Sequence, residues 1–150
     1  MAVLTVPACT NRPELPAIGS GSVVPTTPAL PNACELVTPA DIATALGIAM
    51  RKEGLGGGRD RCRYASDARD EVEITVDRPD RQGVVDAYRA LNPGAEMVEG
   101  IGDEGALFTA NDKGELIFVK GPARFFVVVA SPSASREALL VIGRSAAERL

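Results

Sequence analysis

The sequence contains no histidine, no tryptophan and only three lysines among its 150 residues. Without histidine, a Ser-His-Asp triad and a Cys-His pair are impossible, and the usual zinc sites lose their imidazole ligand. A general base would have to be a carboxylate, a lysine or a tyrosine. We therefore expect no catalytic residues, no metal site and no cofactor, and a carboxylate-based hydrolase is the one enzymatic alternative.

The charge and hydropathy of the chain argue against two further classes of protein, nucleic-acid binders and proteins with a transmembrane helix in this sequence. The net charge is −4 and aromatic residues make up 4% of the chain. Nucleic-acid binders normally carry a basic excess or aromatic stacking platforms, so we expect no nucleic-acid partner. No run of 18 apolar residues is present, so no transmembrane helix is expected within the sequence. An apolar fraction of 45% in 150 residues is enough for the core of one domain.

The composition divides the chain into residues 1–31 and residues 32–150. Six of the eleven prolines lie in the first part, together with a Gly-Ser stretch and only two charged residues, Arg12 and Glu14. Such a segment buries too little apolar surface to offset its ordering entropy. We interpret residues 1–31 as a disordered, partly polyproline-like tether and residues 32–150 as a single folded domain.

Local patterns predict the elements of this domain. Thr38-Pro39 is a typical helix start, with the threonine as N-cap, and Gly47 is a typical stop. Residues 71–77 alternate between polar and apolar, as a half-buried strand does. Residues 125–129 are apolar throughout, which predicts a central strand covered on both faces. The expected helices are 39–46, 82–91 and one beginning after Ser135, and the expected strands are 61–65, 71–77, 104–110, 115–120 and 124–130.

The order α-β-β-α-β-β-β-α, with short turns between the last three strands, predicts an α+β domain. We expect a small antiparallel five-stranded sheet flanked by about three helices. On the 82–91 helix, Val84, Val85, Tyr88 and Leu91 share one face, which we expect to be buried.

Three separated motifs carry a resemblance to a known family. Cys34-Glu35-Leu36-Val37-Thr38-Pro39-Ala40-Asp41 runs into Ala45-Leu46-Gly47, and Cys62-Arg63-Tyr64 and Gly100-Ile101-Gly102-Asp103-Glu104-Gly105 follow. Over residues 32–150 the chain resembles a family of exported actinobacterial cell-envelope lipoproteins, classed as a domain of unknown function. The resemblance implies export, tethering to the envelope, a small sheet flanked by helices, and a Cys34–Cys62 pair. It carries over no catalytic residue.

The three cysteines have to be explained together. If Cys9 carries a lipid, Cys34 and Cys62 can form a disulfide and no thiol is left over. The alternative for Cys34 and Cys62 is two reduced core thiols. Val6-Pro7-Ala8-Cys9 resembles a lipobox, although Pro7 departs from the usual pattern.

The lipobox interpretation needs a longer leader. Met1 to Val6 is too short for the apolar part of a signal peptide and has no basic residue, so we expect a start upstream or a trimmed chain. The alternative for Cys9 is an incidental free cysteine.

Two further motifs have a structural and a functional interpretation. Gly100 to Gly105 matches G-x-G-x-x-G, but a strand follows where a nucleotide-binding loop would open a helix, so we interpret it as a turn. Arg59, Arg61 and Arg63 alternate and are a candidate anion or lipid-headgroup patch. We prefer a solvated strand face whose arginines pair with Glu71, Glu73 and Asp77 on neighbouring strands.

These observations predict a non-catalytic accessory lipoprotein of the cell envelope. We expect an extracytoplasmic, lipid-anchored monomer that binds another envelope protein. The alternative is a carrier or sensor that holds an apolar or lipid ligand between sheet and helices. That alternative needs an enclosed apolar cavity of several hundred Å³.

Overall fold

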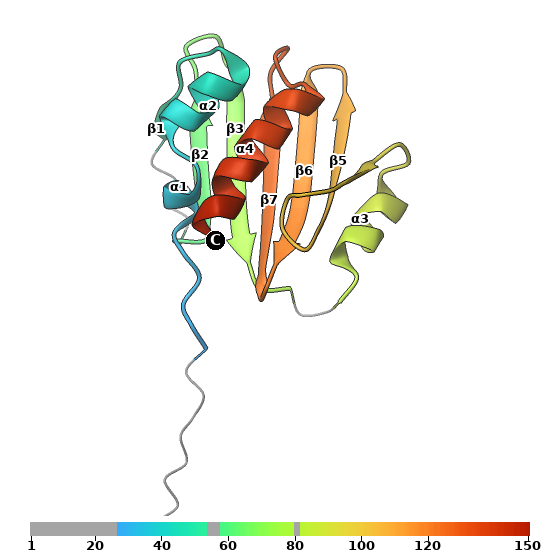
Figure 1. Cartoon of the computed structure of the whole chain (residues 1–150). Coiled ribbons are helices and arrows are strands. Elements are labelled where there is room, and N and C mark those ends of the chain that lie inside the picture. The colour runs from blue at the N-terminus through green and yellow to red at the C-terminus, as the bar shows by residue number, and fades with distance from the viewer. Residues whose placement is uncertain (1–26, 54–57, 80–81) are drawn as a thin grey trace, which may run out of the picture.

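A computed structural model describes residues 27–53, 58–79 and 82–150. Cys9 and most of the predicted tether lie outside these residues. The described part of the chain forms four helices and seven strands (Figure 1). In chain order they are α1 (Ala33–Leu36), α2 (Pro39–Leu46), β1 (Arg51–Glu53), β2 (Arg61–Ala65), β3 (Glu71–Asp77), α3 (Val84–Leu91), β4 (Glu96–Val98), β5 (Glu104–Ala110), β6 (Lys113–Lys120), β7 (Ala123–Ala130) and α4 (Arg136–Arg149).

All seven strands belong to one antiparallel sheet with the order β1-β2-β3-β7-β6-β5-β4. The meander β4 to β7 joins the N-terminal strands through β3 and β7, where Ile74 lies opposite Val127. The strand β7 is therefore central, as its apolar sequence predicts, but the prediction that both of its faces are covered is wrong. Its alternate residues Phe125, Val127 and Val129 are fully buried, whereas Phe126 and Val128 on the other face are only partly buried.

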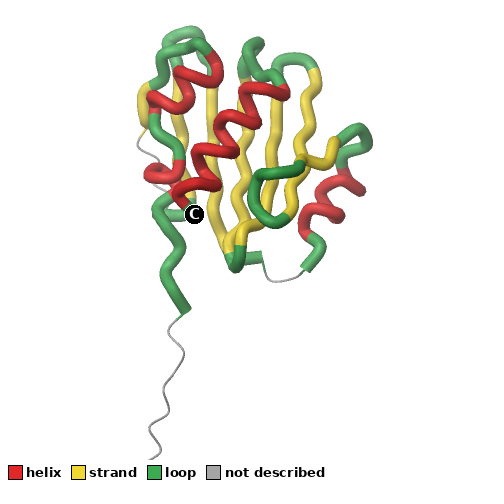
Figure 2. The backbone as a smooth tube through the Cα atoms, viewed as in Figure 1, coloured by secondary structure: helices red, strands yellow, loops and turns green. Residues whose placement is uncertain are grey.

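The helices cover the two faces of the sheet unequally. Helices α1, α2 and α4 lie over one face, with α4 running diagonally across it (Figure 2). Helix α3 packs with Ala106, Ile117 and Phe126, which point to the opposite face from the main core. Because α3 packs mainly on β5 and β6 and reaches Phe126 of β7, the part of this second face that β3 and β2 form has no helix from the described residues packed on it.

The fold-class prediction of five strands and about three helices is wrong. The sheet has two further strands, β1 and β4, and a further helix, α1. Strand β1 is Arg-Lys-Glu and has no apolar residue, and β4 and α1 are three and four residues long. Segments this short show no periodicity, and they form because long-range pairing and packing hold them in place. The predicted strands 61–65, 71–77 and 104–110 have the bounds of β2, β3 and β5.

The segment before α2 is held to the sheet by buried polar contacts. The side chain of Tyr64 is fully buried, and its hydroxyl donates to the carbonyl oxygen of Val37 at 2.5 Å. Burial raises the pKa of this phenol to about 12, so it donates at every physiological pH. Leu36 and Val37 lie in the same core.

A capping box starts α2 and ties it to the end of α4. The amide of Thr38 donates to Asp41 Oδ2 at 2.7 Å, and the amide of Asp41 donates to Thr38 Oγ1 at 3.3 Å. Arg149 donates to the same carboxylate at 2.7 Å. Burial alone would raise the pKa of Asp41, but the bonds from Arg149 and Thr38 outweigh it and lower the pKa to about 2.

We expect Asp41→Asn to lower the free energy of unfolding at neutral pH. Because the pKa of Asp41 falls from 3.8 to about 2 on folding, the ionised form stabilises the folded state by about 2 kcal/mol. This contribution is complete above the unfolded pKa and is lost as the pH falls from about 4 to about 2. Denaturant unfolding across this range measures it, and the Asn variant should show a flatter pH dependence.

The matched control for Asp41 is Asp67→Asn. Asp67 pairs with Arg51, but its side chain is 94% exposed, and exposed ion pairs contribute little. An equal loss of stability in the two variants would contradict the role assigned to Asp41.

Candidate functional site

Cys34 and Cys62 form a disulfide that joins α1 to β2, with Cα atoms 5.1 Å apart. Structural disulfides are typical of oxidising, extracytoplasmic compartments, and we assign the protein to such a compartment. Among the helices of residues 27–53, 58–79 and 82–150, none has the length and apolar character that crossing a bilayer requires.

Six of the eight residues of the motif 34–41 have structural roles. Cys34 forms the disulfide, Leu36 and Val37 are buried, and Thr38 and Asp41 form the capping box. Pro39 occupies the first turn of α2, where its missing amide hydrogen costs nothing. These contacts show that the motif residues stabilise the fold, and none of the contacts indicates a ligand site.

The G-x-G-x-x-G motif forms the turn that leads into β5. Gly102 has a φ of +65°, and a Cβ at this position would lie 2.3 Å from the carbonyl oxygen of Val119. The side chain of Asp103 accepts a hydrogen bond from the amide of Gly121 at 2.7 Å. The loop is thus fastened to the β6–β7 turn, and no helix follows it to hold a phosphate.

The structure places Arg61 and Arg63 on β2, whereas Arg59 lies in the turn before this strand. Arg63 Nη2 lies 2.5 Å from Glu71 Oε1, and Arg61 Nε lies 3.7 Å from Glu73 Oε1. Asp77, the third acidic residue of the predicted pairing, instead binds Arg124. The two strand arginines therefore face carboxylates of β3 on the sheet face that carries α3.

We expect replacement of Arg59, Arg61 and Arg63 by glutamine to leave binding to anionic liposomes unchanged. Arg61 and Arg63 already have carboxylate partners, which reduce the positive potential available to a headgroup. Liposome co-sedimentation at low and moderate salt measures the effect. A salt-sensitive loss of binding in the triple variant would show that these residues form an anion patch.

An open apolar groove lies between α3 and the uncovered half of the sheet, and we name it the α3 groove. Its volume is about 310 Å³. Phe126 and Ile117 contribute from β7 and β6, and Tyr88 and Leu91 contribute from α3. The complete lining is Thr75, Asp77, Val84, Ala87, Tyr88, Leu91, Ile117, Arg124 and Phe126.

The aromatic part of the α3 groove is rigidly held. The rings of Tyr88 and Phe126 meet edge to face, with centroids 6.0 Å apart. The Tyr88 hydroxyl donates to Glu115 Oε2 at 2.9 Å, and Lys113 Nζ lies 2.6 Å from the other oxygen of this carboxylate. Burial and the Glu115 bond raise the pKa of Tyr88, so the phenol stays protonated and serves as a hydrogen-bond donor rather than a base.

Leu91 is the feature of the α3 groove that the sequence pattern misassigns. Periodicity predicts it on the buried face with Val84 and Tyr88, yet it is 82% exposed. The periodicity correctly finds the side of α3 that faces the sheet, but the sheet beyond Phe126 has no described helix that would cover Leu91. The other large hydrophobic residue exposed in the described chain is Met97 on β4, at 47%.

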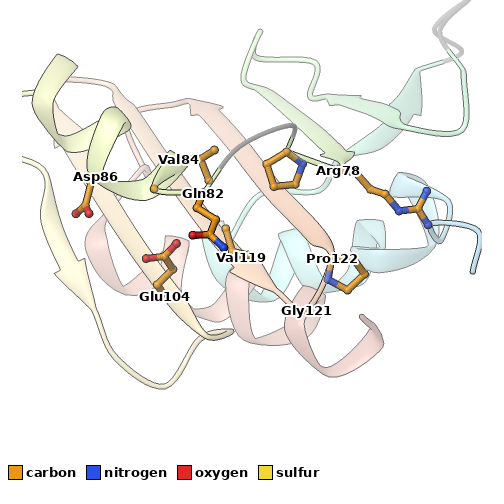
Figure 3. Close-up of a pocket in the computed structure, with 10 residues that line it drawn as sticks. Arg78, Gln82, Val84, Asp86, Glu104, Val119, Gly121 and Pro122 are labelled. Atoms are coloured by element: carbon orange, nitrogen blue, oxygen red, sulfur yellow. The ribbon is translucent and has the colours of Figure 1, made fainter. Parts of the chain in front are cut away.

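A second cleft, the β3-end pocket, adjoins the α3 groove and shares Val84 with it. Its volume is about 710 Å³. Figure 3 shows Gln82 and Val84 pointing into the space between α3 and the β6–β7 turn, with Asp86 and Glu104 together at one side. Arg78 points away from them, and its guanidinium donates to the carbonyl oxygen of Pro28.

The described residues offer no group of three or more acidic or cysteine side chains arranged to hold a metal ion. Asp70 is the buried carboxylate among the described residues. It accepts a 2.6 Å hydrogen bond from the hydroxyl of Ser66, and this bond closes the β2–β3 turn. Hydrogen bonds from Ser66 and Ser131 lower the pKa of Asp70, so it is ionised at neutral pH.

Comparisons of the chain with models of protein families, with curated proteins and with solved structures gave no match in any of the three.

Proposed function

We propose that this protein is a non-catalytic accessory module of the cell envelope that binds another protein through the α3 groove. The observation that carries this proposal is the exposed Leu91 beside an apolar, aromatic-lined groove. Protein-binding surfaces are enriched in aromatic residues and arginine, and a few anchor residues contribute most of their affinity. In the α3 groove, Tyr88, Phe126 and Arg124 supply these residue types.

The placement of the module follows from its cysteines. The Cys34–Cys62 disulfide supports an extracytoplasmic location. We propose that Cys9 carries the lipid anchor and that the Pro-rich segment after it is the tether. The resemblance to exported actinobacterial lipoproteins supports this arrangement, in which the domain acts as an anchored monomer.

Packing on the other face of the sheet disfavours a ligand beneath α4. A Cβ added to Gly143 would lie 2.4 Å from the side chain of Leu116. Gly114 also lies close to α4, with Leu139 Cδ1 at 2.9 Å from its added Cβ. The helix therefore meets the sheet directly, and an apolar ligand would have to bind in the α3 groove instead.

The test is photo-crosslinking in the native host, with a photoreactive amino acid at position 91 or, as a control, at position 97. We expect one predominant protein adduct at position 91 and none of the same mass at position 97. Leu91→Glu should abolish copurification of the adduct partner, and Met97→Glu should preserve it. Identical adducts at both positions would contradict the proposal, and a lipid extracted with the purified protein would instead favour the carrier.

A further inference from the structure

We propose that the partner segment that fills the α3 groove is an amphipathic α-helix, with an apolar stripe toward α3 and lysine or arginine on the flank above β3. This inference names the chemistry of the partner for the surface assigned above, and it rests on that proposed function. The bound helix would lie beside α3, over β7 and β3, and would cover Leu91.

One wall of the α3 groove is a stripe along the whole of α3. The residues that this helix contributes have the spacing i, i+3, i+4 and i+7 and are Val84, Ala87, Tyr88 and Leu91. Val84 and Leu91 are the first and last residues of α3, so the wall is about 12 Å long. Stripes with this spacing are the surfaces through which helices pack on one another. Leu91 is 82% exposed, so the described chain leaves one end of the stripe uncovered.

The floor of the α3 groove can accept side chains but not another strand. Strand β7 pairs with β3 and β6, and β3 pairs with β2 and β7. Their backbone donors and acceptors are therefore used within the sheet, whereas the addition of a partner strand requires a free edge. A partner has to pack against side chains such as Phe126 and Ile117, as helices do on the face of a sheet.

The uncovered part of the sheet has room for one helix beside α3. Helix α3 packs mainly on β5 and β6, and neighbouring strands lie about 4.8 Å apart. Packed helices have axes about 8–10 Å apart, which corresponds to two strands. A second helix would therefore lie over β7 and β3, where Phe126 and Thr75 lie opposite each other and both line the groove.

The charges beside the floor specify the flank of the bound helix. Asp77 and Arg124, which line the groove, pair with each other at 2.8 Å and so favour neither sign of charge. Glu73 lies on β3 next to the apolar floor, opposite Val128 of β7. Its side chain is 44% exposed, and its partner Arg61, at 3.7 Å, is on β2, one strand further from α3. The exposed charge nearest to the floor on this side is therefore negative, which is complementary to lysine or arginine on the helix.

Mapped photo-crosslinking in the native host tests the helix. A diazirine amino acid replaces Ala87 or Leu91 in the full chain, and tandem mass spectrometry identifies the partner residues that it attaches. Because positions 87 and 91 are one turn apart on α3, we expect the two attached residues to lie three or four positions apart in one partner segment. Any other pattern, such as the two-residue spacing of a strand or attachment to separate segments, would overturn the inference and leave the proposed protein-binding function standing. Absence of an adduct from position 91 would overturn both.

A matched pair of substitutions tests the basic flank. Glu73→Lys and Glu53→Lys each reverse a carboxylate that lies 3.7 Å from an arginine of β2, but Glu53 is on the edge strand β1, away from the groove. We expect Glu73→Lys to lower the yield of the position-91 adduct by about tenfold and Glu53→Lys to change it by less than about twofold. Equal yields from the two variants would overturn the basic flank.

Glu73→Gln keeps this test independent of folding. It removes the charge of Glu73 without placing a second cation beside Arg61, and its melting temperature should stay close to that of the wild type because the ion pair is exposed. We expect it to lower the adduct yield in the same direction as Glu73→Lys, by about threefold. An unchanged or higher yield from Glu73→Gln would also overturn the basic flank.

Discussion

Replacing both Cys34 and Cys62 by alanine should lower the free energy of unfolding by about 3.5 kcal/mol, the chain-entropy value for a loop of this length. The disulfide joins residues separated by 28 positions and encloses α2, β1 and the loop that leads to β2. Without it, the unfolded chain gains the entropy of that loop, and α1, a single turn of helix, loses its covalent link to the sheet. Thermal unfolding should show a melting temperature lower by roughly 10 °C.

The control for the double variant is Cys9→Ala. Cys9 takes no part in the Cys34–Cys62 pair, so this change should leave the melting temperature of the domain unaltered. In protein produced without an upstream leader, and therefore not lipidated, alkylation under denaturing conditions without reductant should label Cys9 alone. Two further labelled thiols, or a double variant as stable as the wild type, would contradict both the disulfide and the extracytoplasmic assignment that rests on it.

Gly102→Ala should destabilise the domain by about 3 kcal/mol or more, through strain at a positive φ and a clash in a packed site. The obstacle is the carbonyl oxygen of Val119, 2.3 Å from the added Cβ. This oxygen also accepts the hydrogen bond of the Asp103 amide at 2.7 Å, so it cannot move without disturbing the entry to β5. Denaturant unfolding monitored by circular dichroism measures the loss.

Gly100→Ala is the matched control because it measures the cost of alanine at a positive φ without a steric clash. Gly100 has a φ of +76°, but nothing lies within 4 Å of an added Cβ. We expect this variant to lose only about 1 kcal/mol, the cost of placing alanine in the left-handed region. Equal losses at positions 100 and 102 would show that close packing against β6 is not the reason for glycine at 102.

The parts of the fold that were predicted correctly have a local physical cause. Residues 71–77 alternate because one face of β3 is buried and the other carries charges, and the strand has these bounds. Strand β1 has no such signal, since Arg51, Lys52 and Glu53 are all charged and their pairing with β2 defines the strand. The extra strands and the one-turn helix α1 depend on tertiary contacts that a short segment does not encode.

The candidate site likewise has one part that the sequence predicts and one part that it does not. Arg61 and Arg63 could be matched with acidic residues from sequence because partners on adjacent strands follow from the alternation of side chains. The α3 groove could not be predicted, because the exposure of Leu91 depends on how many helices cover each face. A helix with the same apolar stripe would be fully buried beside a second helix, and only the assembled sheet shows that the described chain has none there.

The most direct test of the envelope assignment is cell fractionation after expression of the gene with its native upstream sequence in a related host. We expect wild-type protein in the detergent phase, with an N-terminal peptide that begins at Cys9 and carries a lipid-sized mass increment. Stable anchoring requires more than one acyl chain, so the increment should correspond to several. Cys9→Ala should be released or stay unprocessed, whereas wild-type protein in the cytosol with residues 1–8 intact would contradict both the lipid anchor and the envelope location.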